Sequence, residues 1–196
     1  MKNAVDSFLN SFELVCPEVT KIELDFIKSG LSITTLKPKE FFLSTNSIHN
    51  EIGFVFSGLI RGYFLDDNGH DITVKFIDAN QFATDYAAFI SQNRSNYSFQ
   101  CLEPTVIVSL SNSHIQEGYE RFPKLERYGR LVAEEVLCIQ QKRIEGFLFK
   151  SPEERYLDFI ADYPNLFNRV TLTHLSSYLG IERQTLTRIR QRLSSE

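Results

Sequence analysis

Short apolar runs separated by turn residues make up the chain from about Ile33 to Leu110. They are rich in β-branched and aromatic residues, which is typical of strands, and read SITTL, GFVFSG, LIRGYFL, DITVKFI, SNYSFQCL and TVIVSL. The Asn68-Gly69 pair in FLDDNGHDITV can supply positive φ, which favours a hairpin between two of these runs. Many short strands joined by such turns predict a compact antiparallel barrel or jelly roll.

The apolar spacing changes near Ser111, where helix formers take over and few breakers follow Pro123. One stripe recurs at intervals of 3, 4, 4 and 3 residues, as in a helix seam, and consists of Leu125, Tyr128, Val132, Val136 and Ile139. A helix of about 25 residues would extend roughly 38 Å, more than most helices of one domain need. We predict that it spans a domain junction and pairs with a partner helix through this stripe. The alternative is that the stripe packs on the strand region of its own chain.

A second helical unit begins with SPEERYLDFIADYP, and several residues mark its ends. Ser151 can cap the helix, Pro152 suits its first position and Glu154 completes a capping box. Pro164 ends the run. The domain boundary is therefore expected near Lys150.

The segment VTLTHLSSYLGIERQTLTRIRQRL fits the constraints of a helix-turn-helix. Leu175 and Leu179 lie four residues apart on one helical face, and Ser176 is small where two helices must approach closely. Gly180 can adopt the left-handed conformation of a tight turn, and Ile181 can plug that turn. The apolar stripe of the second helix consists of Leu186, Ile189 and Leu193.

Positive charge gathers in this last segment, although the formal charge of the 196-residue chain is −4. Between Arg169 and Arg192 five arginines and one acid give +4 (5 − 1), which favours a surface that attracts phosphate. Arg can bind guanine O6 and N7 together, and Gln can bind adenine N6 and N7, so Arg183, Gln184 and Arg188 are the predicted base readers. The predicted DNA-binding set is Thr171, Thr173, Arg183, Gln184, Thr187, Arg188, Arg190 and Arg192. In this set Thr171 and Thr173 would bind phosphate oxygens at the start of the first helix.

The rest of the chain argues against catalysis, metal binding and membrane insertion. The four histidines stand far apart, at His49, His70, His114 and His174. The three cysteines are as widely spaced, at Cys16, Cys101 and Cys138. This spacing excludes CxxC sites and suits a reducing compartment, and no HxH, HExxH, GxSxG or GxxxxGK[ST] motif occurs. Since there is also no long apolar run, we expect a soluble cytoplasmic protein with no catalytic residue and no metal.

With a strand-rich sensor, a long helix and a terminal helix-turn-helix in that order, the chain resembles the Crp/Fnr family of bacterial transcription regulators. SPEERYLDFIADYP and YLGIERQTLTRIRQRL look like the variety common in Bacteroidetes-type members, and GFVFSGLIRGYFLDDNG is similar to the family's cyclic-nucleotide-binding-like β-roll. The resemblance implies an α+β fold with an antiparallel β-roll, a long dimerisation helix and a C-terminal winged helix-turn-helix. The implied regions are a β-roll sensor with flanking helices (1–120), the dimerisation helix (121–150) and the DNA-binding domain (151–196).

The resemblance also implies partners. A homodimer held by the long helix would place two recognition helices in successive major grooves of a near-palindromic operator. Double-stranded DNA, a second copy of the chain, RNA polymerase and an unknown small-molecule effector are the expected partners. Arg183, Gln184 and Arg188 fall where family members contact bases. Many relatives have Glu in place of Gln184, so their base preference does not carry over.

The sensor region departs from the cyclic-nucleotide pattern of the family. Nucleotide-binding relatives open a phosphate-binding cassette with a Gly-Glu pair, where this chain has Ala83-Thr84, and close it with an Arg-Ser pair, kept here as Arg94-Ser95. The missing carboxylate can be replaced only by Asp85. The candidate effector pocket therefore consists of Thr84, Asp85, Arg94 and Ser95. The pattern disfavours a cyclic nucleotide, and the cysteine and histidine patterns of iron–sulfur and haem sensors are missing too, so we expect no cofactor.

Two other functions fit parts of the sequence. The C-terminal helices of a β-roll interaction module could bind a protein instead of DNA, and, with less support, a β-roll could house a small-molecule enzyme. Salt distinguishes the first alternative from a DNA-binding protein. Binding through several arginines weakens steeply as salt rises, whereas an apolar protein interface does not weaken in this way.

Overall fold

The strand-rich region forms two antiparallel four-stranded sheets in the computed structural model, which describes residues 2–193. The first sheet has the order β1 (Leu31–Leu36), β8 (Thr105–Ser111), β3 (Glu51–Ser57) and β6 (Phe82–Ala83). The second has the order β2 (Phe41–Leu43), β7 (Ser98–Cys101), β4 (Ile60–Leu65) and β5 (Asp71–Ile77). The predicted antiparallel β-roll is thus confirmed, and each of the six predicted apolar runs contributes a strand.

Strands β3 and β8 lie between two hydrophobic cores, which explains why their sequences are apolar almost without interruption. Successive side chains of a strand point to opposite faces of the sheet. In β3, Phe54 joins a core shared with helices, while its neighbour Val55 joins the core between the two sheets. In β8, Val108 and Ile107 divide in the same way. A strand buried on both faces has no polar alternation to show.

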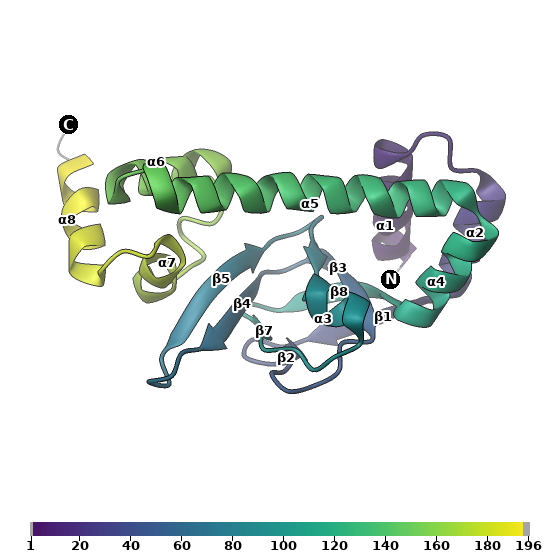
Figure 1. Cartoon of the computed structure of the whole chain (residues 1–196), viewed down its shortest axis with the longest axis horizontal. Coiled ribbons are helices and arrows are strands. Elements are labelled where there is room, and N and C mark those ends of the chain that lie inside the picture. Colours follow the sequence, from purple (N-terminus) through teal and green to yellow (C-terminus); the bar gives the residue numbers. More distant parts are fainter. Residues whose placement is uncertain (1, 194–196) are drawn as a thin grey trace. The chain divides into compact units, whose positions relative to one another are not determined.

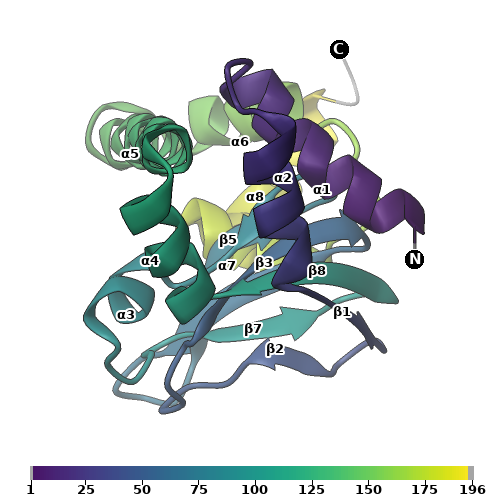
Figure 2. The same ribbon diagram turned by 90° about the vertical axis from the view of Figure 1, so that its right-hand side faces the viewer.

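Helices cover the outer face of the β1-β8-β3-β6 sheet, as Figure 2 shows. They are α1 (Lys2–Val15), α2 (Lys21–Ser29), α4 (Asn112–Arg121) and the first half of α5 (Pro123–Phe149). From α1, Phe8 packs against Phe54 with ring centroids 5.3 Å apart. Its neighbour Phe12 stacks on Tyr128 of α5 at 3.8 Å. The flanking helices thus supply one wall of the first unit's core.

The hairpin between β4 and β5 reverses in residues 66–70, where the Asn68-Gly69 pair was expected to form the turn. Gly69 has φ of 80°, and its amide donates to the carbonyl of Asp66 at 2.9 Å. The carboxylate of Asp66 accepts from the amides of Asn68 and His70 at 2.9 and 2.8 Å. Glycine therefore supplies the positive φ, and the aspartate side chain satisfies the remaining amides of the turn.

The C-terminal region contains three short helices, α6 (Pro152–Asp162), α7 (Leu172–Leu179) and α8 (Arg183–Leu193). The predicted capping box of α6 is confirmed, because the Ser151 hydroxyl accepts from the amide of Glu154 and the Glu154 carboxylate accepts from the amide of Ser151. Residues 163–170, between α6 and α7, form turns. Over residues 150–193 we therefore find a helix-turn-helix without the strands of the predicted wing.

Two compact units divide the chain, and the boundary between them lies inside α5, which is one unbroken helix (Figure 1). The first comprises residues 1–64 and 75–135, and the second comprises residues 65–74 and 136–196. In the second unit the Ser177 hydroxyl accepts from the amide of Thr73 at 2.9 Å and donates to the carbonyl of Asp71. Met1, which begins the predicted region 1–120, and residues 194–196, which end the predicted region 151–196, lie outside the described residues.

Removing a side chain from the helix–sheet core should destabilise the protein far more than removing one from its surface. Leu125 is 1% exposed, so Leu125→Ala is expected to lower the free energy of unfolding by about 2–5 kcal/mol. The control Leu14→Ala removes the same atoms at a residue that is 83% exposed, and should change it by no more than about 0.5 kcal/mol. Urea unfolding followed by circular dichroism measures both. Equal losses would contradict this core assignment.

Candidate nucleic-acid interface

The helix-turn-helix is built from local signals that the structure bears out. The Thr171 hydroxyl caps α7 by accepting from the amide of His174 at 3.1 Å. Gly180 ends the helix in the left-handed conformation, with φ of 61° and ψ of 42°, and its amide donates to the carbonyls of Ser176 and Ser177. This is the cap that a glycine after the last helical turn provides. The chain then enters α8 after two residues.

Apolar packing fixes α8 against α7. Ile181 is 8% exposed, and its amide donates to the carbonyl of Ser176 at 3.0 Å, so it plugs the turn as predicted. Ser176 is itself buried, which fits the close approach of the two helices. The buried apolar side chains of this unit are Tyr156, Phe159, Leu166, Leu175, Leu179, Ile181, Leu186 and Ile189. Because Leu186 and Ile189 are fully or nearly buried, α8 cannot rotate about its axis.

A polar face of α8 is directed away from this core. At about 100° per residue, Gln184, Thr187, Arg188 and Gln191 lie opposite the side of Leu186 and Ile189. Arg183 lies at the edge of the same face and, like Gln184 and Arg188, is exposed. Within residues 2–193 the structure gives the guanidinium groups of Arg183 and Arg188 no ion-pair partner. These two cations are therefore available to an external ligand.

Two of the predicted DNA-binding arginines instead contact their own chain. The guanidinium of Arg190 lies 4.4 Å from the ring centroid of Phe167, a cation–π contact. Arg192 forms an ion pair with Glu153 of α6. Both side chains are thus engaged on the flanks of α8. Assigning them to DNA from charge alone overlooked partners that are distant in sequence.

Thr171 and Thr173 are both exposed at the beginning of α7. The oxygen of Thr171 already accepts from the amide of His174, so its hydroxyl has a hydrogen left to donate. The carbonyl of Thr173 accepts from the Ser176 hydroxyl. Thr173 itself is exposed to solvent. Both residues stand at the N-terminus of α7, where the helix dipole favours an anion.

The predicted seam of α5 is only partly exposed. Leu125 and Tyr128 are 1% and 7% exposed, because they pack in the first unit's core, where the Tyr128 hydroxyl also lies 3.3 Å from that of Ser11. Val132 packs against the same core. Leu125 and Tyr128 therefore cannot form a seam with a partner, and for these two residues the alternative of packing within the chain is correct. Val136 and Ile139 are 39% and 51% exposed and stay available.

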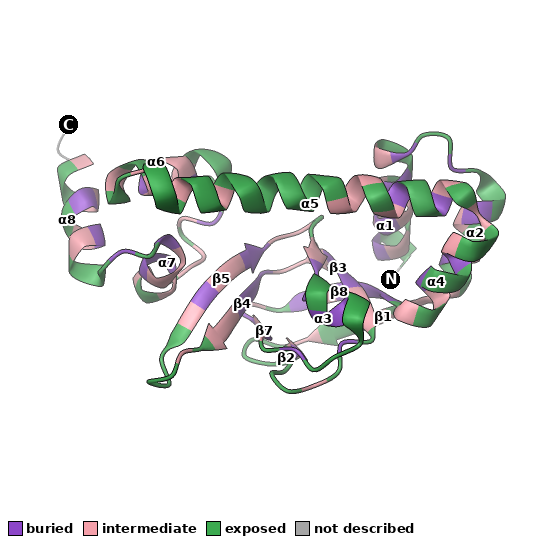
Figure 3. Ribbon diagram, in the orientation of Figure 1, coloured by how far each residue is buried: buried purple, intermediate pink, exposed green. Residues whose placement is uncertain are grey.

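The C-terminal half of α5 is exposed along most of its length (Figure 3), and it carries a second set of exposed apolar side chains. Leu137, Ile144 and Leu148 are 67%, 59% and 69% exposed and follow one another at intervals of 7 and 4 residues. On a helix this places them on one side, about 100° from the side of Val136. We call Leu137, Ile144 and Leu148 the outer stripe. Exposed apolar side chains gathered on one side of a helix are typical of an interaction surface.

Three residues of the candidate effector pocket lie close together in the β-roll. The carboxylate of Asp85 is buried, accepts from the Ser95 hydroxyl at 2.7 Å and caps the short helix α3 (Tyr86–Ser91) by accepting from the amide of Ala88 at 3.3 Å. The Thr84 hydroxyl lies 3.1 Å from His49 Nε2. The fourth residue, Arg94, is exposed and donates to the carbonyl of Asn46 at 2.5 Å.

Two bases adjoin this network, the buried His49 and the half-buried Lys75, and sequence reasoning missed both. Lys75 donates to the carbonyl of Thr84 at 2.6 Å and lies 4.8 Å over the ring of Phe99. Burial lowers the pKa of Lys75 to about 8, while nearby Asp85 acts in the opposite direction. Burial also lowers the pKa of His49 to about 4, so His49 is neutral at physiological pH. The polar groups of the pocket are thus satisfied within the chain.

Within residues 2–193 no group of three His, Cys, Asp or Glu side chains could hold a metal ion. Over the same residues, no helix combines the length and the apolar character needed to cross a membrane.

Comparison with solved structures places this fold. FixK2 from Bradyrhizobium japonicum superposes with a TM-score of 0.73 at 14% identity, over 84% of this chain and 85% of its own. The c-di-GMP-responsive global regulator CLP from Xanthomonas campestris gives 0.70 at 12% identity, over 90% and 92%. A mutant of CooA from Carboxydothermus hydrogenoformans gives 0.66 at 17% identity, over 91% and 80%. The chain has the fold of these three proteins.

No protein-family model and no curated protein matches the sequence. At identities this low, the superpositions establish the fold, which agrees with the α+β class and the β-roll expected from the Crp/Fnr resemblance. The 27 residues of α5 also agree with the predicted helix of about 25 residues.

Gly180 should resist substitution for two reasons that a second glycine separates. Gly180 and Gly69 both have a left-handed φ, which strains any other residue. A Cβ added at Gly180 would lie 2.9 Å from Phe147, whereas a Cβ added at Gly69 would have nothing within 4 Å. Gly69→Ala should lower the free energy of unfolding by about 1 kcal/mol from backbone strain alone. Gly180→Ala should lower it by about 2–3 kcal/mol, because the contact with Phe147 adds to the strain. Equal losses in urea unfolding would mean that Phe147 yields freely.

Proposed function

We propose that this protein is a sequence-specific DNA-binding transcription regulator of the Crp/Fnr type. The observation that carries the proposal is the outward face of α8, where Arg183, Gln184 and Arg188 project from a helix whose rotation is fixed by a buried apolar side. A rigid recognition helix with exposed Arg and Gln can enter a major groove. The shared fold of solved bacterial regulators supports this reading.

The chemistry of these side chains suits the reading of base edges. The fork of Arg183 or Arg188 can donate to guanine O6 and N7 together, and the Gln184 amide can pair with adenine N6 and N7. Thr187 lies on the same face, while Thr171 and Thr173 would bind phosphate oxygens from the start of α7. Arg190 and Arg192 hold the flanks of α8 and have at most a secondary part in binding. No catalytic step belongs to the proposal.

We also propose that the protein binds a near-palindromic operator as a homodimer. The outer stripe of α5 is the expected seam, whereas Val136 and Ile139 are exposed on other sides of the helix, about 100° and 160° away. Two copies packed through this stripe would bury apolar side chains that are otherwise solvated, and would present two copies of α8 to successive major grooves. RNA polymerase is the further partner expected of a regulator that acts on transcription.

For the β-roll we propose an effector that is not a cyclic nucleotide. The Asp85 carboxylate, the only candidate to accept from a ribose hydroxyl, already accepts from Ser95 and Ala88. Arg94 lies at the surface beside Asn46. An effector acting through Thr84, Asp85, Arg94 or Ser95 would first have to displace these internal hydrogen bonds. An effector that does so could change the pose of α5, and with it DNA affinity.

A protein-interaction module remains the second candidate, favoured by the exposed apolar side chains near the end of α5. The two functions differ in their dependence on salt. Binding through phosphate contacts should fall linearly on a double logarithmic plot as salt rises, with a slope of about −0.9 for each phosphate neutralised. Binding through an apolar surface should change little over the same range.

The base readers can be tested on duplexes that the wild-type protein selects from a random pool. Arg188→Ala and Arg183→Ala are each expected to weaken binding to the selected duplex by about 1–3 kcal/mol and to relax sequence preference, because a bidentate base contact is lost. Arg130→Ala is the matched control, since it removes an exposed arginine that pairs with Glu134 on α5. Titration of each variant against the selected and mismatched duplexes is the measurement. Unchanged discrimination would remove the role assigned to these arginines.

The dimer seam can be tested by placing a charge on the outer stripe. Ile144→Glu should shift the protein from dimer toward monomer at micromolar concentration, because the carboxylate would be buried without a partner. Cys138→Glu adds the same charge at an exposed position about 100° around the helix and should leave the dimer intact. Sedimentation velocity distinguishes the two states. If both variants stay dimeric, the interface lies elsewhere.

A further inference from the structure

Two arginines from outside the helix-turn-helix donate hydrogen bonds to the end of α7. Arg143 of α5 donates from Nη2 to the carbonyl of Tyr178 at 2.9 Å. Arg155 of α6 donates from Nε to the carbonyl of Leu179 at 2.9 Å and from Nη2 to that of Gly180 at 3.4 Å. The last carbonyls of an α-helix have no partner within the helix. Here two guanidinium groups bind three successive carbonyls at the turn that leads into α8.

The electrostatics of this arrangement are favourable. The C-terminus of a helix carries a partial negative charge, so a cation at this position is stabilised, and a hydrogen bond from a charged donor is stronger than one between neutral groups. Arg155 also donates from Nη1 to the carbonyl of Lys150 at 2.8 Å. One planar guanidinium therefore joins the connection between α5 and α6 to the turn between α7 and α8.

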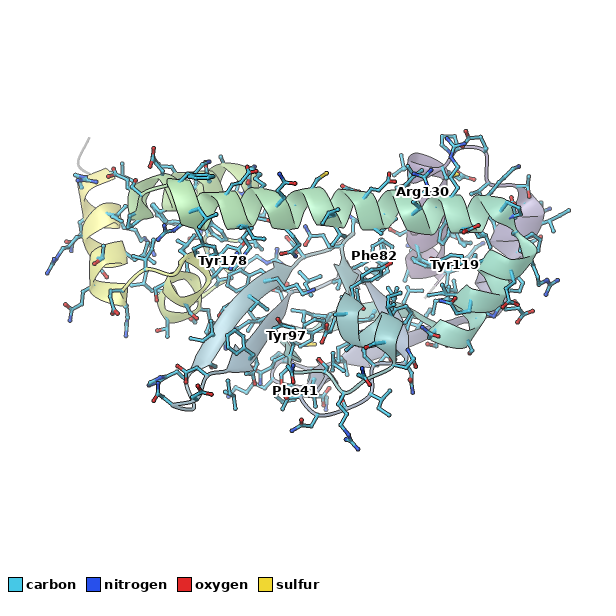
Figure 4. The ribbon with its side chains drawn as sticks, in the orientation of Figure 1. Phe41, Phe82, Tyr97, Tyr119, Arg130 and Tyr178 are labelled. Carbon is cyan, nitrogen blue, oxygen red and sulfur yellow. The ribbon has the colours of Figure 1, made fainter. Side chains whose placement is uncertain are left out.

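Aromatic rings complete the contact with α5. The guanidinium of Arg143 lies 3.9 Å from the ring centroid of Tyr178, which Figure 4 labels between α5 and α7, and 5.0 Å from that of Phe147. Arg155 lies 5.4 Å over the same Phe147 ring. Phe147 in turn occupies the space that a Cβ on Gly180 would need. The turn is thus held on α5 by two cations and by one ring.

From these contacts we infer that Arg143 and Arg155, the carbonyl clamp, are positioning residues for DNA recognition. They fasten the turn between α7 and α8 to α5, and so fix the orientation of α8 without touching DNA. Both side chains are half-buried, and their donors are directed at carbonyl oxygens, so neither presents its charge to a phosphate. This inference rests on the proposed function, since it concerns how a DNA-reading helix is held.

Arg143 of the clamp lies on the same half of α5 as the outer stripe, and Arg155 lies on α6. If α5 pairs with its copy, a clamp that fastens α8 to α5 also determines the separation of the two α8 helices. Loosening the clamp should then relax the spacing that two half-sites must have. An arginine that contacted phosphate would behave differently. Its loss would weaken binding to every sequence and make the salt dependence shallower by about 0.9.

The test compares full-length Arg143→Ala and Arg155→Ala with a matched control, Lys142→Ala. Lys142 neighbours Arg143 and is a cation of α5, but it pairs with Asp162 instead of α7. The probes are the duplex selected by the wild-type protein and versions whose centre is longer or shorter by about one or two base pairs. Each clamp variant should lose about tenfold in affinity for the selected duplex, on the scale of one charged hydrogen bond. It should also discriminate less between spacings, while the salt slope stays unchanged.

Lys142→Ala should behave as the wild-type protein does. A slope shallower by about 0.9 in a clamp variant would overturn the inference, because that arginine would then bind phosphate directly. Unchanged affinity together with unchanged preference for spacing would overturn it as well. If the wild-type protein selects no duplex, the proposed function is wrong. The clamp is then tested by a measurement that needs no DNA.

That measurement is amide hydrogen exchange at Gly180 and Ile181 in the free protein. Both amides donate to carbonyls of α7, so a looser turn should exchange them about tenfold faster in the clamp variants than in Lys142→Ala. Arg155→Lys should recover part of the protection, because an ammonium can still donate to one carbonyl. If Arg155→Ala does not fold, Arg155→Lys is measured in its place. Equal exchange in all variants would overturn the clamp, whether or not the chain binds DNA.

Discussion

The candidate interface depends on one backbone conformation, the left-handed residue at Gly180. Without it, the Gly180 amide could not donate to the last carbonyls of α7, and Ile181 would not lie in the core. The direction of α8 follows from this reversal, and its rotation follows from the burial of Leu186 and Ile189. Which side chains face solvent on α8 is therefore decided by the turn and by two apolar contacts, and not by the charged residues themselves.

Helix α5 shows how one helix can serve different purposes along its length. Its first turns belong to the core of the first unit, where Tyr128 stacks on Phe12 of α1. Its last turns hold Arg143 and Phe147 against the end of α7 and expose the outer stripe on another side. A helix with a single apolar face could not do this. The buried apolar positions of the first turns and the outer stripe of the last turns lie on different sides of α5.

The parts of the fold that were predictable are those whose signals are local. The caps of α6 and α7, the left-handed Gly180 and the spacing of the buried leucines are all read within a few residues. The seam was not predictable in this way, because only contact with Phe12, more than a hundred residues earlier, shows that Tyr128 is used within the chain. The brief strands β2 and β6 carry too few residues for a pattern. The clamp was missed because Arg143 and Arg155 read as ordinary surface cations.

The local excess of positive charge overstates the number of cations that are free to contact DNA. Arg192 is neutralised by Glu153, and Arg190 lies on Phe167, so neither contributes a free cation to the outward face of α8. Arg183 and Arg188 remain, and they are the arginines that helical geometry directs away from the core. Two exposed cations can neutralise few phosphates, so they contribute little to sequence-independent binding. Selectivity in this chain must then come mainly from base contacts and from the fixed separation of two such helices, which makes the attachment of α8 to α5 as important as the residues that α8 presents.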